Sequence, residues 1–260
     1  MGKIISIFNQ KGGVGKTTTN INLCSYLASM GKRVLTVDID PQGNTTSGLG
    51  IEKRKLENSI YDVIMGLSAD KVIINTNINN LDIIPSNVEL AGAEIELTSK
   101  IDRERRLKKA FEDIKDNYDY IIIDCPPSLG LLTLNALTAS NSVLIPIQCE
   151  FYALEGVSQL MSTIQLVKKS LNKDLYIQGV IMSMFDGRTN LSIEVVEEVK
   201  KYFKGKVYTT IIPRNIKLAE APSYGMPIML YDKNSKGAEA YKRLAEEFLE
   251  YDEGDDKGEH

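Results

Sequence analysis

The chain has 260 residues, of which 43% are hydrophobic and 25% charged, and this composition excludes a fibrous or intrinsically disordered protein. Its 31 basic and 35 acidic residues leave a formal net charge of −4, so contact with nucleic acid would need a local basic region. The single histidine, His260, is the last residue, which excludes histidine-dependent catalytic triads and histidine-based metal sites. No apolar stretch approaches the roughly 18 residues of a membrane span, and we expect a cytoplasmic protein with reduced cysteines.

Short apolar runs rich in β-branched residues alternate along the chain with segments of helical periodicity. The expected strands are Lys3–Phe8, Arg33–Asp38, Leu81–Ile84, Tyr120–Asp124, Val143–Ile147, Ile177–Ile181 and Val207–Ile212. The expected helices are Thr18–Met30, Ile101–Asp116, Ala153–Leu171, Leu191–Phe203 and Ala238–Tyr251. This alternation predicts an α/β fold: a single-domain, doubly wound, mostly parallel sheet with helices on both faces. We place the domain at residues 1–250 and expect the acidic residues 251–260 to form a disordered tail.

A glycine-rich loop lies between the first expected strand and the first expected helix, which is the context that a phosphate-binding loop requires. Glycines let consecutive N–H groups converge on phosphate oxygens, and the helix N-terminus adds a favourable dipole. We expect Lys16 to pair with the β- and γ-phosphates, the Thr17 hydroxyl to bind Mg²⁺ and Thr18 to donate toward the α-phosphate. A glycine-rich turn with solvated lysines is the alternative. The expected phosphate-binding residues are Lys11, Gly12, Gly13, Val14, Gly15, Lys16, Thr17 and Thr18.

Lys11 is not required by the generic phosphate loop. With it, the segment KGGVGKTT resembles the deviant Walker A motif of the partitioning and positioning ATPases that include ParA/Soj and MinD. The resemblance covers nearly the whole chain and is to chromosomal ParA/Soj proteins through VDIDPQGN at 37–44, YIIIDCPPS at 120–128 and EFYALEG at 150–156. It implies ATP and Mg²⁺ as cofactors, ATP hydrolysis, and a nucleotide-sandwich homodimer in which Lys11 reaches the phosphates of the second copy.

Two carboxylates follow strand ends. Asp124 ends an apolar strand, where a carboxylate can hold Mg²⁺ through water. The resemblance implies that Asp40 orients or polarises the attacking water, so Lys11, Lys16 and Asp40 are the expected catalytic residues. A helix N-cap for Asp124 and a turn carboxylate for Asp40 are the alternatives, and Asp38 either supports the metal indirectly or simply ends its strand.

By the same resemblance, Pro213 and Asn215 pack on and hydrogen-bond the adenine, although a turn before a helix is an alternative reading of this segment. Cys24, Cys125 and Cys149 are expected to be small buried side chains without chemistry. They also lack the paired arrangement of an iron–sulfur carrier.

The region Met161–Glu220 contains ten Lys/Arg and six Asp/Glu, a local charge of +4 on an acidic chain. Such a region suits non-specific phosphate binding, although a solvated helix face is the alternative. The resemblance implies that Arg188 and Lys217 bind DNA. Relatives often have arginine in place of Lys217, so this residue keeps the charge without the bidentate geometry.

The resemblance thus implies a nucleoid-associated ATPase that binds double-stranded DNA non-specifically as an ATP-bound dimer and drives chromosome or plasmid segregation. Its hydrolysis would be stimulated by a ParB/Spo0J partner, and a link to replication initiation through DnaA is also suggested. Because the chain starts at the phosphate-loop strand, we expect no N-terminal helix-turn-helix and no sequence-specific DNA reading.

Other classes fit the sequence less well. A MinD-like membrane-cycling ATPase needs a basic amphipathic C-terminal helix, whereas this chain ends in acidic residues, and no membrane partner is expected. A tyrosine kinase of the same superfamily would carry a dense C-terminal tyrosine cluster. A non-enzymatic binding module would leave unexplained why four residues stand together without turnover: Lys16, Thr17, Asp40 and Asp124.

Overall fold

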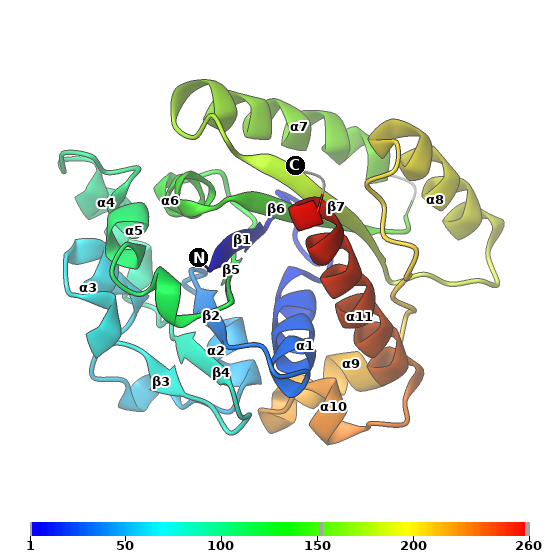
Figure 1. Ribbon diagram of the computed structural model, residues 1–260, viewed down its shortest axis with the longest axis horizontal. Coiled ribbons are helices and arrows are strands. Elements are labelled where there is room, and N and C mark those ends of the chain that lie inside the picture. The colour runs from blue at the N-terminus through cyan, green and yellow to red at the C-terminus, as the bar shows by residue number, and fades with distance from the viewer. Residues whose placement is uncertain (1, 151–152, 258–260) are drawn as a thin grey trace.

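A central sheet covered by helices on both faces dominates the computed structural model, which describes residues 2–150 and 153–257 (Figure 1). The strand order is β3-β4-β2-β5-β1-β6-β7, and every neighbouring pair is parallel except β3 with β4. The expected α/β fold with a mostly parallel sheet is therefore confirmed. The strands are β1 (Lys3–Ile7), β2 (Val34–Asp38), β3 (Ile74–Asn75), β4 (Leu81–Ile84), β5 (Tyr120–Asp124), β6 (Ser142–Gln148) and β7 (Tyr176–Ser183).

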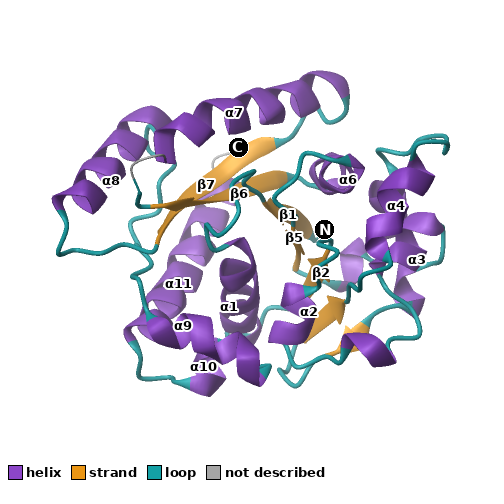
Figure 2. Cartoon of the chain, turned by 180° about the vertical axis from the view of Figure 1, so that it is seen from behind, coloured by secondary structure: helices purple, strands orange, loops and turns teal. Residues whose placement is uncertain are grey.

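Helices lie on both sides of this sheet, with α1, α9, α10 and α11 on one face and α3 to α8 on the other (Figures 1 and 2). None of the helices within the described ranges is long and apolar enough to span a membrane. The helices are α1 (Lys16–Ser29), α2 (Asn44–Gly48), α3 (Ile60–Met65), α4 (Leu90–Leu97), α5 (Arg106–Phe111), α6 (Leu131–Ala139), α7 (Ala153–Ser170), α8 (Asn190–Phe203), α9 (Ile216–Glu220), α10 (Ile228–Tyr231) and α11 (Lys236–Lys257).

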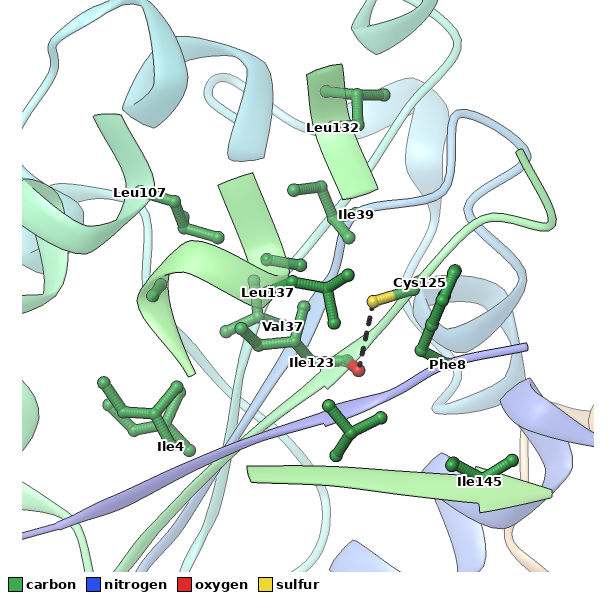
Figure 3. Close-up of a cluster of buried hydrophobic side chains, with 14 of the residues drawn as sticks. Ile4, Phe8, Val37, Ile39, Leu107, Ile123, Cys125, Leu132, Leu137 and Ile145 are labelled. Carbon is green, nitrogen blue, oxygen red and sulfur yellow. Dashed lines mark hydrogen bonds between the residues drawn. The ribbon is translucent and has the colours of Figure 1, made fainter. Parts of the chain in front are cut away.

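The two hydrophobic cores arise from the alternation of side chains along each strand. In β5, Ile121 and Ile123 face the core under α3 to α8, whereas Ile122 faces the core under α1 and α11. Figure 3 shows the first of these cores, in which Phe8, Ile123 and Cys125 lie side by side. The three cysteines are buried and free, as expected. Because both faces of the sheet are covered, its central strands can be continuous β-branched runs.

The expected strand Val207–Ile212 does not form. Val207 and Pro213 make only isolated bridges to Val180 and Phe185. Between them, the N–H groups of Thr209 and Thr210 donate to the Glu247 carboxylate on α11 instead of to a neighbouring strand. A side chain that arrives from the far end of the sequence therefore diverts this backbone out of the sheet.

Two helix predictions also need correction. In the segment Ile101–Asp116 the α-helix is limited to the short α5, and a 3₁₀ turn follows at Lys115–Asn117. The helix does not begin at Ile101 because Asp102 adopts a left-handed conformation, φ 54°, that a right-handed helix excludes. The predicted boundary at residue 250 and the disordered tail are wrong for residues 251–257, since α11 continues to Lys257. Asp252 anchors this end by accepting from Lys3 Nζ at 2.8 Å and from the Tyr120 hydroxyl at 2.7 Å. Residues 258–260 lie outside the described residues.

Gly179 in β7 gives a test of the packing on this sheet. A Cβ at this position would overlap the ring of Tyr208, which is 2% exposed and packs edge-to-face on Tyr251. We therefore expect Gly179→Ala to lower the free energy of unfolding by about 1–3 kcal/mol, measured by urea denaturation. Gly92→Ala is the control, because its Cβ would approach no atom closer than 3.8 Å and alanine favours the helix. Equal stability of the Gly179 variant and the wild type would contradict the packing argument.

Candidate nucleotide-binding and hydrolysis site

The carboxyl ends of β1, β2 and β5 meet at one edge of the sheet. Asp38 and Asp124 are direct partners in the β2–β5 register, and Asp124 is also opposite Ile7 at the end of β1. The phosphate loop leaves the end of β1, which is the neighbour of β5, and enters α1 at Lys16. Ligands of open α/β sheets bind at this edge.

The phosphate loop depends on two glycines with positive φ, Gly13 at 75° and Gly15 at 92°, which other residues rarely adopt. No side chain caps the N-terminus of α1 and no acidic residue occupies its first turn, so its N–H groups suit an anion. A Cβ at Gly12 would meet no atom within 4 Å, so this glycine is not required by packing within the subunit.

Lys16 is 7% exposed, and its Nζ donates to the Lys11 carbonyl at 3.1 Å. Burial lowers the pKa of Lys16, and the neighbouring charges of Asp124 and Asp40 oppose that shift. The ammonium group is thus held inside the loop, in the field of the predicted metal residue Asp124 and the predicted catalytic residue Asp40. The alternative of a glycine-rich turn with solvated lysines is therefore wrong for Lys16, which is buried.

Asp124 is buried and accepts through Oδ2 from the hydroxyls of Thr17 and Thr45, each at 2.8 Å. Its Oδ1 is buried and has no hydrogen-bond partner within the described ranges. A carboxylate oxygen and a neighbouring threonine hydroxyl are hard oxygen ligands of the kind that Mg²⁺ prefers, so these residues fit that ion. The alternative of a helix N-cap fails, because Gly130 is the N-cap residue of α6.

Thr45 was missed by the sequence analysis, although it follows directly on the segment VDIDPQGN. Its hydroxyl donates to Asp124 and also accepts from Asn20 Nδ2 at 3.2 Å, which in turn donates to Thr36. No spacing rule connects residue 45 with residue 124, because only the β2–β5 pairing brings them together.

Asp38 organises the turn that carries Asp40. Its Oδ2 accepts from the N–H and the hydroxyl of Thr46 at 2.8 and 2.7 Å, and its Oδ1 accepts from the Asp40 N–H at 3.2 Å. Asp40 itself accepts from the Gln42 N–H at 2.9 Å, which is the turn geometry that the alternative interpretation expected. Asp38 is therefore a buried support of this turn rather than a mere strand end.

Burial raises the pKa of both Asp38 and Asp124, and their mutual repulsion adds to the shift at Asp124. The hydroxyl and main-chain donors that surround them work in the opposite direction. A bound cation would offset this repulsion and favour the ionised form of both carboxylates.

A cavity of about 380 Å³ adjoins the phosphate loop. Gly15 and Thr18 line it from one side, and Pro213 and Asn215 line it from the other, so the predicted phosphate and adenine residues are brought together. Asn215 also caps α9, since its Oδ1 accepts from the Lys217 N–H at 2.8 Å. Asn215 therefore lines the cavity, as the adenine interpretation requires, and also begins a helix, as the alternative interpretation requires.

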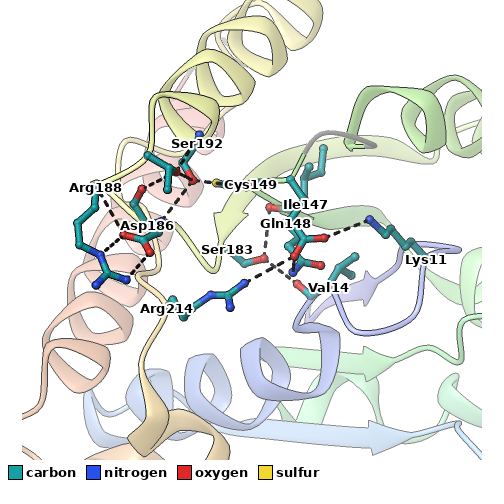
Figure 4. A network of polar contacts seen from close by, with 12 residues as sticks. Lys11, Val14, Ile147, Gln148, Cys149, Ser183, Asp186, Arg188, Ser192 and Arg214 are labelled. Carbon is teal, nitrogen blue, oxygen red and sulfur yellow. Dashed lines mark hydrogen bonds and ion pairs between the residues drawn. The ribbon is translucent and has the colours of Figure 1, made fainter.

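A polar network ties this cavity to β6 and β7 (Figure 4). The Ser183 hydroxyl donates to the Val14 carbonyl at 2.8 Å and so holds the phosphate loop against β7. The Glu150 carboxylate lies between Lys11 Nζ at 3.8 Å and the Arg214 guanidinium at 3.6 Å. Sequence reasoning assigned no role to Ser183, and it placed Arg214 in the adenine segment and in the basic region without a contact of its own. Phe151 and Tyr152 of the segment EFYALEG lie outside the described residues.

The two predicted DNA-binding residues are on separate elements, and each is paired with its own carboxylate. Arg188, 86% exposed, makes a two-pronged contact with Asp186 and lowers the pKa of Asp186 to about 2 (Figure 4). Lys217 pairs with Glu220 at 2.8 Å and lies 5.7 Å from the centre of the Tyr231 ring. Any DNA phosphate would therefore compete with an internal partner.

Comparisons with known proteins agree with this geometry. The AAA domain family matches residues 2–177. The chain is 65% identical over 249 residues to the sporulation initiation inhibitor protein Soj of Bacillus subtilis, covering 95% of this chain and 98% of that one. It is 53% identical over 253 residues to the chromosome partitioning protein ParA of Myxococcus xanthus, covering 97% and 89%.

The structure of this chain is also similar to solved structures of other proteins. Cobyrinic acid a,c-diamide synthase from Mycobacterium smegmatis, with bound ADP and magnesium, gives a TM-score of 0.85 at 37% identity, with 97% of this chain and 96% of that chain covered. A putative plasmid partition protein from Borrelia burgdorferi bound to AMPPNP gives 0.81 at 31% identity, with 96% and 99% covered.

The fold and the site together define a P-loop ATPase in which the phosphate loop follows an inner strand, β1, of a mostly parallel sheet. Within that class, the chain belongs to the Soj/ParA family of chromosome-partitioning ATPases.

The buried carboxylate pair predicts a pH dependence of stability in buffer without Mg²⁺ or nucleotide. With raised pKa values, the folded state binds more protons than the unfolded chain between about pH 4, the ordinary carboxyl range, and about pH 7, the pKa of Asp124. The free energy of unfolding therefore falls as pH rises through this window. Asp124→Asn removes one titrating group and the repulsion on Asp38, so we expect a shallower fall and a higher stability at pH 7.

Urea denaturation midpoints measured from pH 4 to pH 8 would test this. Asp113→Asn, which alters an exposed carboxylate, should keep the wild-type slope. The same slope in the Asp124 variant as in the wild type would show that burial does not govern its titration.

Proposed function

We propose that this chain uses ATP binding and hydrolysis to control its own dimerisation and DNA binding, and that this cycle drives chromosome or plasmid segregation. The observation that carries the proposal is the buried Asp124, which has a free oxygen and sits beside Thr17 and Lys16 at the mouth of the phosphate loop. The hydrolysed nucleotide is ATP and the metal cofactor is Mg²⁺.

The residues around the phosphate loop have separate tasks. Thr17 and, through water, Asp124 would hold Mg²⁺, which supplies positive charge against the phosphates. Lys16 adds a second charge on the β- and γ-phosphates, and Gly13 and Gly15 expose N–H donors to them. Pro213 and Asn215 would bind the adenine across the cavity. Asp40, on a turn fixed by Asp38, would orient the attacking water.

Lys11 and Gly12 support a nucleotide-sandwich homodimer. The Lys11 side chain is 39% exposed, and among residues 2–150 and 153–257 it is held only by the long contact with Glu150, so it can reach the phosphates of a second copy. Gly12 presents open space at the same surface, which lets a second subunit approach closely. A dimer completed by Lys11 would form only when ATP is bound.

Dimerisation would also control DNA binding. The basic region Met161–Glu220 is weakened by pairing of Arg188 with Asp186 and of Lys217 with Glu220, so one subunit offers little net attraction. Two such surfaces joined by ATP would bind non-specific double-stranded DNA together, through avidity. The protein would thus associate with the nucleoid in its ATP-bound state.

Release would follow hydrolysis stimulated by a ParB/Spo0J-type protein, and we extend the proposal to a contact with the replication initiator DnaA. These are the partners that the resemblance to chromosomal ParA/Soj proteins implies, and the membership of this chain in that family supports them. The MinD-like alternative draws on the fold shared with the cell division ATPase MinD of Pyrococcus furiosus, which gives a TM-score of 0.78 at 29% identity.

The proposed cycle predicts that ATP hydrolysis rises only when non-specific duplex DNA and the ParB-type protein of the same genome are both present. Asp40→Ala should still bind ATP but should lose about 10²–10⁴-fold in rate, because a group that orients or activates water contributes about that much. Steady-state phosphate release and equilibrium ATP binding would measure the two effects. The control is Glu52→Ala, which removes an exposed carboxylate paired with Lys55.

Normal turnover by the Asp40 variant would remove that residue from the mechanism. Activity that ignores DNA but rises with anionic vesicles would favour the membrane-cycling alternative instead.

The internal ion pairs predict opposite effects of two neighbouring substitutions on DNA affinity in the ATP state. Arg188→Ala should weaken binding and lower the slope of log affinity against log salt by about 0.9 for each phosphate that is no longer neutralised. Asp186→Ala should strengthen binding, because it frees Arg188 from its carboxylate. Fluorescence anisotropy over a salt series would measure both.

Arg243→Ala is the matched control, since this arginine is also exposed and paired with a glutamate but lies on α11. Equal DNA affinity of the Asp186 variant and the wild type would show that Arg188 does not contact DNA.

A further inference from the structure

The side chain of Lys53 lies against the segment that carries Asp40, although it belongs to a run of three basic residues at the surface. This run is the short 3₁₀ helix Lys53–Lys55. Lys53 is half-buried, and its Nζ donates to the Gln42 carbonyl at 2.7 Å. It makes no ion pair with a carboxylate of the described residues. Hydrogen bonds from an ammonium group are stronger than neutral ones, so this contact fixes the main chain at Gln42.

The aliphatic part of Lys53 packs on the same segment. Residues 40–43 form a turn, called the Asp40 turn below, in which the Gly43 N–H donates to the Asp40 carbonyl at 2.9 Å. Gly43 has a φ of 61°, and a Cβ there would lie 2.6 Å from Lys53 Cδ and 2.9 Å from the Ser86 carbonyl oxygen. The end of the turn is therefore enclosed between Lys53 and Ser86.

Ser86, which follows β4, holds the start of the Asp40 turn. It is buried, and its hydroxyl donates to the Asp40 carbonyl at 2.8 Å. Its N–H donates at 2.9 Å to the hydroxyl of Thr46, which in turn donates to the Asp38 carboxylate. The carbonyls of the turn are thus held by two donors from outside it, the Ser86 hydroxyl and the Lys53 ammonium.

This arrangement bears on the Asp40 carboxylate, which accepts from the Gln42 N–H inside the same turn. Because that donor moves with the turn, the direction of the carboxylate depends on how the main chain of the turn is held. A displacement of about 1 Å at a reacting group can cost about 10²-fold in rate. Loss of a contact that holds the turn should therefore slow a reaction that depends on Asp40.

We propose that Lys53 and Ser86 are positioning residues for ATP hydrolysis, which clamp the main chain of the Asp40 turn so that the Asp40 carboxylate meets the attacking water. This inference rests on the proposed function, from which it takes the role of Asp40. Neither Lys53 nor Ser86 lines the nucleotide cavity. Both residues therefore set the rate of ATP cleavage and leave the affinity for ATP unchanged.

Lys53→Met tests the clamp, because methionine keeps an unbranched stem over Gly43 and removes the ammonium. We expect the rate of phosphate release at saturating ATP to fall at least about tenfold, with and without DNA and the ParB-type protein. Equilibrium binding of ATP should not change. Lys53→Arg should recover most of the rate, since a guanidinium can also donate to the Gln42 carbonyl. The matched control is Lys55→Met on the same 3₁₀ helix, where the side chain is 74% exposed and pairs with Glu52.

Ser86→Ala tests the other contact of the clamp. It should also lower the rate without changing ATP affinity, but by less, because the Gly43 N–H still donates to the Asp40 carbonyl. Ser142→Ala is the matched control. Ser142 is 1% exposed and donates to Gln178 Oε1 at 2.8 Å, on β6 and β7, so its loss removes a buried serine contact away from the turn.

The decisive measurement places Lys53→Met in the Asp40→Ala background. Single-turnover cleavage of radiolabelled ATP should be no slower in the double variant than in Asp40→Ala, because the carboxylate that Lys53 positions is gone. A further fall as large as the one in the wild-type background would overturn the proposal. So would a loss of ATP affinity in parallel with the rate, because Lys53 would then support the nucleotide site as a whole.

A fall confined to the rate with the ParB-type protein would also overturn the proposal, since Lys53 would then contact that partner instead of holding the turn. A normal rate for Lys53→Met beside a slow Asp40→Ala would contradict the clamp alone. A normal rate for Asp40→Ala would contradict the role of Asp40 in the proposed function, and the clamp would have no carboxylate to position.

Discussion

Two carboxylates buried side by side at the ends of β2 and β5 impose the main constraint on this protein. Asp38 and Asp124 are neighbours in the strand register, and both are removed from solvent. Burying a charge is costly unless hydrogen bonds and opposite charges surround it. The threonines at 17, 45 and 46, the main chain at Asp40 and the ammonium of Lys16 all serve this purpose.

The hydrogen bonds that satisfy the two buried carboxylates also determine the role that each of them can have. Asp38 uses both of its oxygens within the fold, and as a result the Asp40 turn is rigidly placed. Asp124 uses only one oxygen for hydrogen bonds in the part of the chain that the structure describes, which leaves the other available to a cation. Two residues of the same type at paired positions therefore differ in role because their hydrogen-bond partners differ.

Ion-pair partners within the chain also determine how strongly the exposed basic residues can bind other molecules. Arg188 and Lys217 are exposed, yet each is already matched by a carboxylate on its own segment. Exposed ion pairs contribute little to stability, so their main effect here is on binding. A surface weakened in this way suits a protein whose DNA binding depends on joining two subunits.

Local sequence patterns were sufficient to predict the elements that form through interactions among residues close together in the chain. The β-branched runs at β1 and β5 and the glycines of the phosphate loop specify a strand, a loop and a helix without help from distant residues. The predictions for Lys16, Thr17 and Asp124 followed from this order. The prediction failed at Val207–Ile212, where Glu247 captures the backbone donors, and at residues 251–257, where Lys3 and Tyr120 hold Asp252.

Only the tertiary structure could decide which distant groups meet. Thr45 reaches Asp124 and Ser86 reaches Asp40 because parallel strands bring their carboxyl ends to one edge, whatever their separation along the chain. The sequence by itself therefore determined the class of chemistry, since a phosphate loop is a local motif. The support of the carboxylates, the pairing of the basic residues and the contacts that hold the Asp40 turn were decided by packing, which depends on interactions between distant residues that no local pattern contains.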